Sequence, residues 1–289
     1  MARALRRRAG GFRRPPGLRS HVYTVQLPLE QDHDVGWKPH RLFRGSTPSI
    51  ARMGCHVSVL DAGCQPHPPH RHAEEEILLI LDGETDLVLE DPRDPDAVLR
   101  ERVHRGTFAY YPTDFAHTIH NTSGRPVTYG MFKWTTNHRA HTSDLGHRLV
   151  SLSQSHAGTE GSGRPGFATN RALDGSTRCL QRLHSHLTTL QPGAGYAPHI
   201  DRYDVAIVTL EGIVETIGER AEPNSVIFYP AGEPHGMRNV GDTPAVYLVF
   251  EFHRRHWSNA PLVENQVRRI RRLRLRAAQR FTSPARSRG

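Results

Sequence analysis

The chain has 289 residues, with 38 Lys and Arg against 29 Asp and Glu, and a formal net charge of +9. This length allows two domains of ordinary size. It contains no apolar run as long as a membrane span, which predicts a soluble protein. The three cysteines are scattered and odd in number, which argues against a disulfide framework and predicts a reducing, cytoplasmic location.

The positive charge is concentrated at the two ends. Residues 1–20 carry seven Arg and no acidic residue, and residues 262–289 carry nine Arg and one Glu. The ends contribute +7 and +8, which leaves the middle of the chain at −6. The positive net charge therefore does not indicate a nucleic-acid surface on the central part of the chain.

The N-terminal half begins with an Arg-rich tail, residues 1–20, that we expect to be disordered. It lacks the apolar stretch of a secretory signal, although a mitochondrial-type presequence stays open. Residues 21–150 read as short strands and turns. The segment EEEILLILDGETDLVLED predicts two strands around an Asp82-Gly83 turn, which is typical of a hairpin.

Four side chains in this half form a candidate metal site. His70, His72 and Glu76 follow the pattern H-x-H-x-x-x-E, and residues at even spacing share one face of a strand. His117 must come from a different strand. Three imidazoles and one carboxylate are suitable ligands for a divalent transition metal.

The two stretches around these ligands resemble the cupin family. The first runs from Gly63 to Gly83 with one extra residue before His70, and the second runs from Gly106 to Asn121. Asp114 stands where the family has Gly, and Asp tolerates the positive φ of a tight turn. The resemblance implies a double-stranded β-helix, or jelly-roll, barrel.

The pattern occurs twice. Gly193, His199, Asp201 and Gly212 repeat the first motif, and residues 224–239 repeat the second, with His235 in the place of His117. Self-similarity of this kind indicates a duplicated module. The chain therefore resembles a bicupin over about residues 40–255, which predicts an all-β protein of two tandem cupin barrels.

The second copy departs from the first at its ligands. Asp201 replaces the second histidine, and Val205 stands where Glu76 stands. Asp204 is one residue away and should face the other side of its strand. We expect the second copy to be a barrel that has lost its metal, with His199, Asp201 and His235 as a possible second site.

The remaining segments complete the expected order of domains. Residues 151–176 read as a linker, 177–258 as the second barrel, and 259–289 as a basic amphipathic helix and tail. We expect the helix to pack on the second barrel or on a partner in a homodimer. An anionic membrane surface or nucleic acid is the alternative contact.

The expected cofactor is one divalent transition metal, with Fe²⁺ or Mn²⁺ favoured and Ni²⁺, Co²⁺ or Zn²⁺ open. Catalytic candidates are Glu76, Glu74 as an acid or base, and Lys133 as a binder of a substrate carboxylate. The residue pattern by itself favours a solvated carboxylate at the rim for Glu74 and an outward-facing strand lysine for Lys133.

The resemblance implies a metalloenzyme acting on a small polar organic substrate, most often an O₂-dependent oxidoreductase of the dioxygenase kind. An isomerase, a decarboxylase or lyase, and an aminohydrolase are alternatives within the family. A non-catalytic sensor of a small molecule such as a sugar, and a purely structural bicupin, are the alternatives outside enzyme function.

Overall fold

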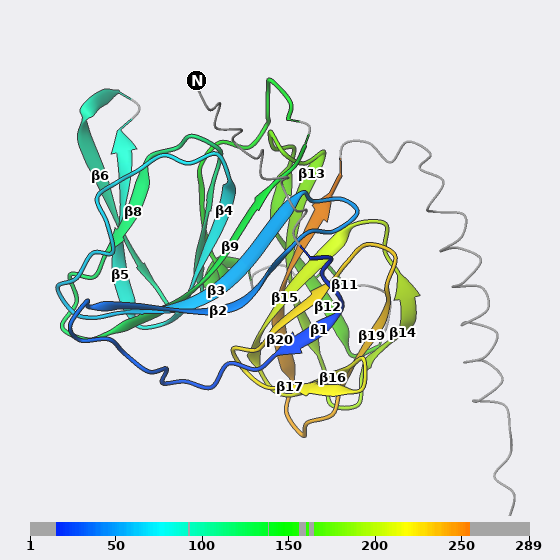
Figure 1. Ribbon diagram of the computed structural model, residues 1–289. Coiled ribbons are helices and arrows are strands. Elements are labelled where there is room, and N and C mark those ends of the chain that lie inside the picture. Colours follow the sequence, from blue (N-terminus) through cyan, green and yellow to red (C-terminus); the bar gives the residue numbers. More distant parts are fainter. Residues whose placement is uncertain (1–15, 92, 138, 156–159, 162–164, 255–289) are drawn as a thin grey trace, which may run out of the picture.

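The computed structural model describes residues 16–91, 93–137, 139–155, 160–161 and 165–254. Within these ranges the regular structure is β, with one short helix, α1 (Leu152–Ser155). The all-β prediction is confirmed, and the two barrels lie side by side (Figure 1). The basic helix expected over residues 259–289 lies outside the described residues. No described helix has both the length and the apolar character needed to cross a membrane.

The first barrel consists of a large and a small sheet. The large sheet has the strand order β10-β7-β4-β9-β3-β2, and the small sheet has the order β6-β5-β8. The bounds are β2 Trp37–Gly45, β3 Arg52–Leu60, β4 Glu75–Asp82, β5 Glu84–Asp91, β6 Asp94–His104, β7 Thr107–Tyr111, β8 His117–His120, β9 Val127–Thr135 and β10 Arg148–Ser151.

The second barrel repeats this plan. Its large sheet has the order β1-β18-β15-β20-β13-β12-β11, and its small sheet has the order β14-β19-β16-β17. The bounds are β1 His21–Tyr23, β11 Glu160–Gly161, β12 Phe167–Gly175, β13 Arg182–Leu190, β14 Gly195–Ile200, β15 Asp204–Glu211, β16 Val214–Thr216, β17 Glu219–Ala221, β18 Val226–Tyr229, β19 Pro234–Asn239 and β20 Ala245–His253.

Three segments lie elsewhere than the sequence boundaries suggested. Strand β1, expected in the first barrel, pairs antiparallel with β18 of the second. Strand β12, expected in the linker, pairs with β13. Residues 16–20, expected in the disordered tail, are held by backbone hydrogen bonds to Ser46 and by Glu233, which accepts from Ser20. An edge strand needs only backbone partners, so short and weakly patterned segments can add to a sheet.

The turn at Gly83 connects two sheets and does not close a hairpin. Strand β4 pairs with β7 and β9, whereas β5 pairs with β6 and β8. The prediction of a β4–β5 hairpin is therefore wrong. Gly83 has φ 82°, and a Cβ there would lie 3.0 Å from the Pro126 carbonyl oxygen, so this crossing between sheets requires glycine.

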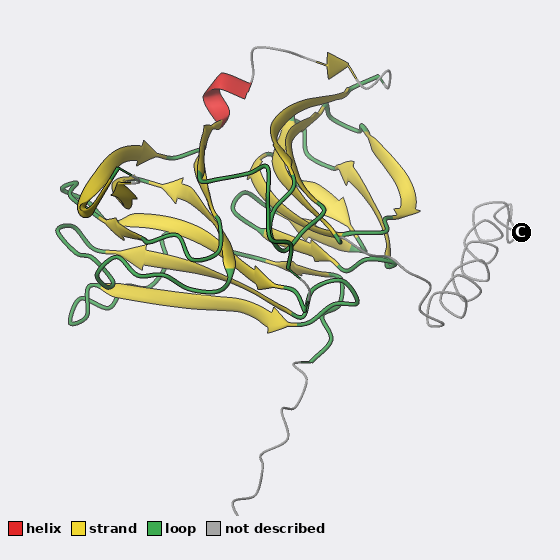
Figure 2. Ribbon diagram, turned by 90° about the horizontal axis from the view of Figure 1, so that it is seen from above, coloured by secondary structure: helices red, strands yellow, loops and turns green. Residues whose placement is uncertain are grey.

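The large sheets of the two barrels pack against each other, so central strands such as β4 are buried on both faces. On β4, Ile77 and Leu79 belong to a core shared by the two barrels, which also includes Phe250 of β20. Leu78 and Ile80 point into the first barrel and join its own core. This double burial explains the continuous apolar run of β4, because neither face meets water. Figure 2 shows the two barrels from above, with α1 at the upper edge of this view.

Candidate metal centres

The loop before β4 and the start of β8 bring the first set of candidate ligands together. His70 forms an isolated bridge with His117, the first residue of β8, and His72 lies in the loop beyond it. The sequence placed His70 and His72 on the strand of Glu76, but β4 begins only at Glu75. Pro68 and Pro69 have no N–H to donate to a ladder, which keeps this segment outside the sheet.

One carboxylate oxygen of Glu76 lies close to three other side chains of the first centre. Glu76 Oε2 lies 3.1 Å from His72 Nε2, 3.4 Å from His117 Nε2 and 3.0 Å from Lys133 Nζ. Glu76 is fully buried. Burial raises the pKa of this carboxyl, but the close approach of His117 and His72, together with nearby positive charge, outweighs it and leaves the pKa well below its usual value. Glu76 is therefore an ionised carboxylate.

Backbone carbonyls orient the two imidazoles. His72 Nδ1 lies 3.0 Å from the Glu74 carbonyl oxygen, and His117 Nδ1 lies 2.9 Å from the Phe115 carbonyl oxygen. A carbonyl accepts only from a protonated nitrogen, so these bonds favour the tautomer whose Nε2 is free to bind a metal. Tyr111 stacks on the His117 ring with centroids 3.8 Å apart and fixes its plane.

His70 lies at the side of this group. Its ring centroid is 5.3 Å from that of His72 and 5.9 Å from that of His117, and it lies outside the close set formed by His72, Glu76 and His117. Burial lowers the pKa of His70 to about 4, and the positive charges of neighbouring groups add to this effect. A neutral imidazole is the form that binds metals.

The first centre fits a divalent metal because two of its buried polar atoms lack hydrogen-bond partners. Glu76 Oε1 and His70 Nδ1 are both buried without a hydrogen-bond partner in the structure. A buried acceptor without a partner costs about 1–3 kcal/mol. A cation bound among these side chains would satisfy such atoms, and imidazole with carboxylate suits the first-row transition metals.

Positive charge continues from this centre across the sheet. Arg44, Gly54, Lys133, Glu76 and Tyr111 are cross-strand neighbours in one row over β2, β3, β9, β4 and β7. Paired residues in such a row share one face. Gly54 has no side chain, which leaves open space between the arginine and the lysine.

A cavity of about 190 Å³ lies at this row. Four cationic side chains and one carboxylate, Glu74, are among the residues that line it; the cations are Arg41, Arg44, Arg52 and Lys133. Lys133, which the sequence left open as an outward-facing residue, points to Glu76. Glu74 Oε1 lies 3.4 Å from Arg52 Nη1, so this carboxylate is at the cavity wall.

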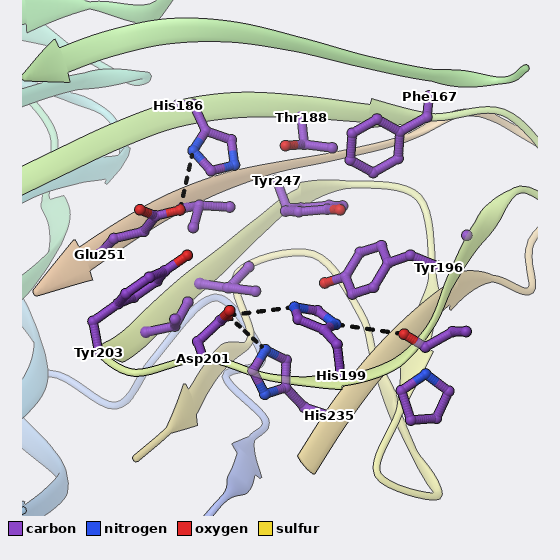
Figure 3. Close-up of a pocket in the computed structure, with 16 residues that line it drawn as sticks. Phe167, His186, Thr188, Tyr196, His199, Asp201, Tyr203, His235, Tyr247 and Glu251 are labelled. Atoms are coloured by element: carbon purple, nitrogen blue, oxygen red, sulfur yellow. Dashed lines mark hydrogen bonds and ion pairs between the residues drawn. The ribbon is translucent and has the colours of Figure 1, made fainter. Parts of the chain in front are cut away.

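The second copy forms a comparable group from its own motif. Asp201 Oδ2 lies 3.3 Å from both His199 Nε2 and His235 Nε2 (Figure 3). Tyr229 stacks on His235 as Tyr111 does on His117. Burial raises the pKa of Asp201, but hydrogen bonds from the two histidines outweigh it and lower the pKa overall. Asp204 faces the opposite side of β15, as expected. Loss of the metal here remains a prediction.

A larger cavity, of about 690 Å³, opens beside this second group. Its volume lies within the range of small-molecule sites. Aromatic side chains form much of its wall, as Figure 3 shows: Phe167, Tyr196, Tyr203 and Tyr247. The sequence analysis did not identify this cavity, because its wall combines β12, which was assigned to a linker, with strands from both sheets.

A third group was also missed. His184 and His186 on β13 and Glu251 on β20 have potential ligand atoms that all lie within 4.8 Å of one another. Burial lowers the pKa of His186 to about 4 despite the opposing effect of Glu251, so this imidazole is neutral. The available signal was the H-x-H spacing in a strand, but its partner carboxylate is 65 residues further along the chain.

The two residues that replace motif glycines keep the positive φ of the backbone at those positions. Asp114 has φ 63° and Asn224, which replaces the first Gly of the second motif, has φ 69°. Both types tolerate this left-handed region. The expectation that Asp114 is compatible with the turn is confirmed.

A protein-family model described as "Cupin domain" matches residues 56–132 and again residues 186–251. No curated protein matches the chain at a significant level. One of the two regions that match the family lies in each barrel, and each region includes the ligand motifs of its barrel.

Solved structures share the fold at low identity. A Pseudomonas aeruginosa protein named for induction by glyoxylate is 15% identical, with TM-score 0.60 over 82% of this chain and 87% of that chain. Salicylate 1,2-dioxygenase from Pseudaminobacter salicylatoxidans is 14% identical, with TM-score 0.58 over 81% and 83%. A deletion mutant of Bacillus subtilis oxalate decarboxylase is 13% identical, with TM-score 0.55 over 82% and 78%.

Proposed function

This chain belongs to the cupin superfamily and carries two cupin domains, and we propose that it is a metal-dependent enzyme acting on a small organic anion in its first barrel. The observation that carries the proposal is the contact of Lys133 Nζ with Glu76 Oε2, at the wall of a cavity with four cationic side chains. A metal ligand and an anion-binding surface thus meet at one point.

The proposed metal ligands are His70, His72, Glu76 and His117. The unsatisfied Glu76 Oε1 and His70 Nδ1 support this assignment. We propose Fe²⁺ or Mn²⁺, while Ni²⁺, Co²⁺ and Zn²⁺ suit the same donors. When bound, such an ion supplies Lewis acidity and, if it is redox-active, access to O₂ chemistry.

The cationic wall determines the proposed substrate class. A carboxylate entering the cavity would meet Lys133 and the guanidinium of Arg44, with the space above Gly54 between them. Arginine suits planar carboxylates because it offers a fork of donors. Glu74 lies at the same wall and is the proposed proton acceptor or donor.

Within this class we propose an O₂-dependent oxidoreductase of the dioxygenase kind. The close set of His72, Glu76 and His117, to which His70 would add a fourth donor, supports it, because imidazole and carboxylate donors with open positions suit Fe(II). Decarboxylase or lyase, isomerase and aminohydrolase activities use similar centres. A second candidate function, binding of a small molecule without chemistry, is supported by the 690 Å³ cavity of the second barrel.

The test combines metal content with O₂ uptake. Protein purified without a metal-affinity tag is analysed by plasma mass spectrometry, for wild type and His72→Ala. We expect about one Fe or Mn per chain in wild type and its loss in the variant. The wild-type protein is then screened for O₂ consumption with small aliphatic and aromatic carboxylic acids, with their neutral amides as controls.

The outcomes separate the parts of the proposal. O₂ uptake with an acid and not with its amide supports an oxidoreductase for organic anions. Conversion of an acid without O₂ consumption would replace the dioxygenase part with a lyase or isomerase. Absence of stoichiometric metal in wild type would overturn the enzyme proposal and favour ligand binding.

A further inference from the structure

The second barrel holds a cluster of potential ligands that is separate from its cupin motif. His184 and His186 lie on β13, Glu251 lies on β20, and none of the three comes from the motif segments around His199 and His235. We propose that they form a binding site for a divalent ion of the Zn²⁺ class, with two imidazoles and one carboxylate as protein ligands. This donor set is one that catalytic zinc sites use.

The strand register shows why this site is specific to the second copy. Asp174, His184, Glu251, Val205 and Tyr229 form one cross-strand row over β12, β13, β20, β15 and β18. It corresponds, strand for strand, to the row of Arg44, Gly54, Lys133, Glu76 and Tyr111 in the first barrel.

The charges of the two rows are reversed. Asp174 and Glu251 occupy the positions of Arg44 and Lys133, and His184 fills the position of Gly54. The first row presents cations beside its metal centre, whereas the second presents carboxylates and an added imidazole. Two of the three proposed ligands are thus new at positions where the first copy has none, and the second row favours a cation.

Local contacts leave this cluster incomplete without an ion. His186 Nδ1 is buried and has no hydrogen-bond partner, because Glu251 Oε1 is 4.0 Å away. Glu251 Oε2 is 2.8 Å from His253 Nε2, which occupies only one of the two carboxylate oxygens. An ion with bonds of about 2.0–2.2 Å would draw His186 and Glu251 Oε1 together and satisfy both.

Neighbouring residues can orient His184. Asp174 Oδ1 lies 3.4 Å from His184 Nδ1, the arrangement in which a carboxylate holds one ring nitrogen and leaves Nε2 for a metal. Arg182 is a competitor at the same place, since its Nη2 lies 3.2 Å from His184 Nδ1 while its guanidinium pairs with Asp174. Metal binding therefore requires His184 Nδ1 to donate to Asp174.

The cluster is open to a ligand on one side. Its three side chains are each 14–18% exposed, and His186 and Glu251 line the 690 Å³ cavity, where Figure 3 shows them on the wall beyond Tyr203. A three-ligand site with one open position is the arrangement of a reactive or ligand-binding metal rather than a purely structural one.

The test uses Zn²⁺ itself as the probe. Full-length protein is stripped with chelator and titrated with Zn²⁺ by equilibrium dialysis with elemental analysis, for wild type, Glu251→Gln and His186→Ala. We expect each variant to bind one ion fewer per chain, or to bind that ion on the order of 100-fold more weakly. Wild-type stoichiometry and affinity in both variants would overturn the proposal.

Three further variants make the result specific. His253→Gln should retain the ion, and with at least wild-type affinity, because it frees Glu251 Oε2. His199→Ala should leave the same ion in place; its loss there would assign the ion to the cupin motif and overturn the proposal. Glu251→Lys reproduces the residue that the first barrel has at this position. It provides a second disabling variant if thermal unfolding shows that Glu251→Gln does not fold.

Discussion

Glu75 and Glu76 are neighbours on β4, yet their carboxylates face opposite sides of the sheet. Glu76 points into the first barrel, where it meets His72, His117 and Lys133. Glu75 points into the junction with the second barrel. One strand therefore contributes both to the candidate metal centre and to the contact that joins the two halves of the chain.

Replacing these two glutamates should separate stability from metal binding. Glu75 accepts hydrogen bonds from Trp134 Nε1, Thr177 Oγ1 and the Cys179 N–H, at 3.0, 2.7 and 3.0 Å. Glu75→Ala leaves three buried donors unpaired and should lower the free energy of unfolding by about 3 kcal/mol or more. Its metal content should stay at the wild-type level.

Glu76→Ala should have the opposite profile. It removes a proposed metal ligand, so metal content should fall steeply while the interface donors keep their partner Glu75. Urea denaturation and plasma mass spectrometry on both variants provide the comparison. Loss of metal in Glu75→Ala with retained stability would contradict the assignment of faces.

The two lysines of the chain allow a matched test of the anion site. Lys133 contacts Glu76, whereas Lys38 pairs with Glu30 at 2.7 Å. Lys133→Met removes a cation beside the metal ligands and should tighten metal binding by about tenfold, because about 1.4 kcal/mol of repulsion is lost. It should weaken the binding of a carboxylate substrate, seen as a raised KM.

Lys38→Met is the control and should change neither quantity. Metal affinity is measured by competition with a chromophoric chelator, and KM by the activity found in the substrate screen. A Lys133→Met protein with wild-type KM for the carboxylate would show that this lysine does not bind the substrate.

Asp204 should make the stability of the fold depend on pH. It is fully buried, and burial raises its pKa from 3.8 to about 6, against hydrogen bonds from Thr47 Oγ1 and the Ala231 N–H. The folded state therefore holds this proton more tightly than the unfolded state. The stability that this proton contributes to the folded state is present in full below about pH 4. It is lost as pH rises through 6, which lowers the free energy of unfolding by up to about 3 kcal/mol.

Asp204→Asn should remove the fall in the free energy of unfolding between pH 4 and 6.5. The variant should also be less stable at low pH, because its amide donor meets the Thr47 hydroxyl, whose oxygen already accepts from Ser49 and Ile50. Urea midpoints measured across this pH range test the slope. An unchanged slope in the variant would assign the pH dependence to other groups.

The motif group of the second barrel is tested by His199→Ala. If this copy has lost its metal, the native Fe or Mn content of the purified protein should be unchanged in the variant, whereas His72→Ala should abolish it. The structure brings His199 and His235 to Asp201 as closely as their counterparts approach Glu76. A fall of about half in His199→Ala would show that both barrels hold the ion.

The spacing of the motifs was sufficient to predict the two barrels and the convergence of three of the four candidate ligands of the first centre. His72, Glu76 and His117 do converge, because the motif fixes how far each residue lies from a turn. Asp114 and Asn224 could also be interpreted locally, since positive φ is a property of single residues. The duplication was visible because both copies keep the same intervals.

What the sequence left undetermined depends on pairs that are distant along the chain. The Thr177 hydroxyl meets Glu75 from 102 residues away, and β1 joins β18 across more than 200 residues. The reversed charges of the two rows were equally hidden, because Arg44 and Lys133, like Asp174 and Glu251, become neighbours only through strand register. Local spacing specifies turns and strand faces, whereas the order of strands in a sheet is decided by which apolar faces pack together. Only the tertiary structure therefore shows the cationic wall of the first cavity and the His184, His186 and Glu251 cluster.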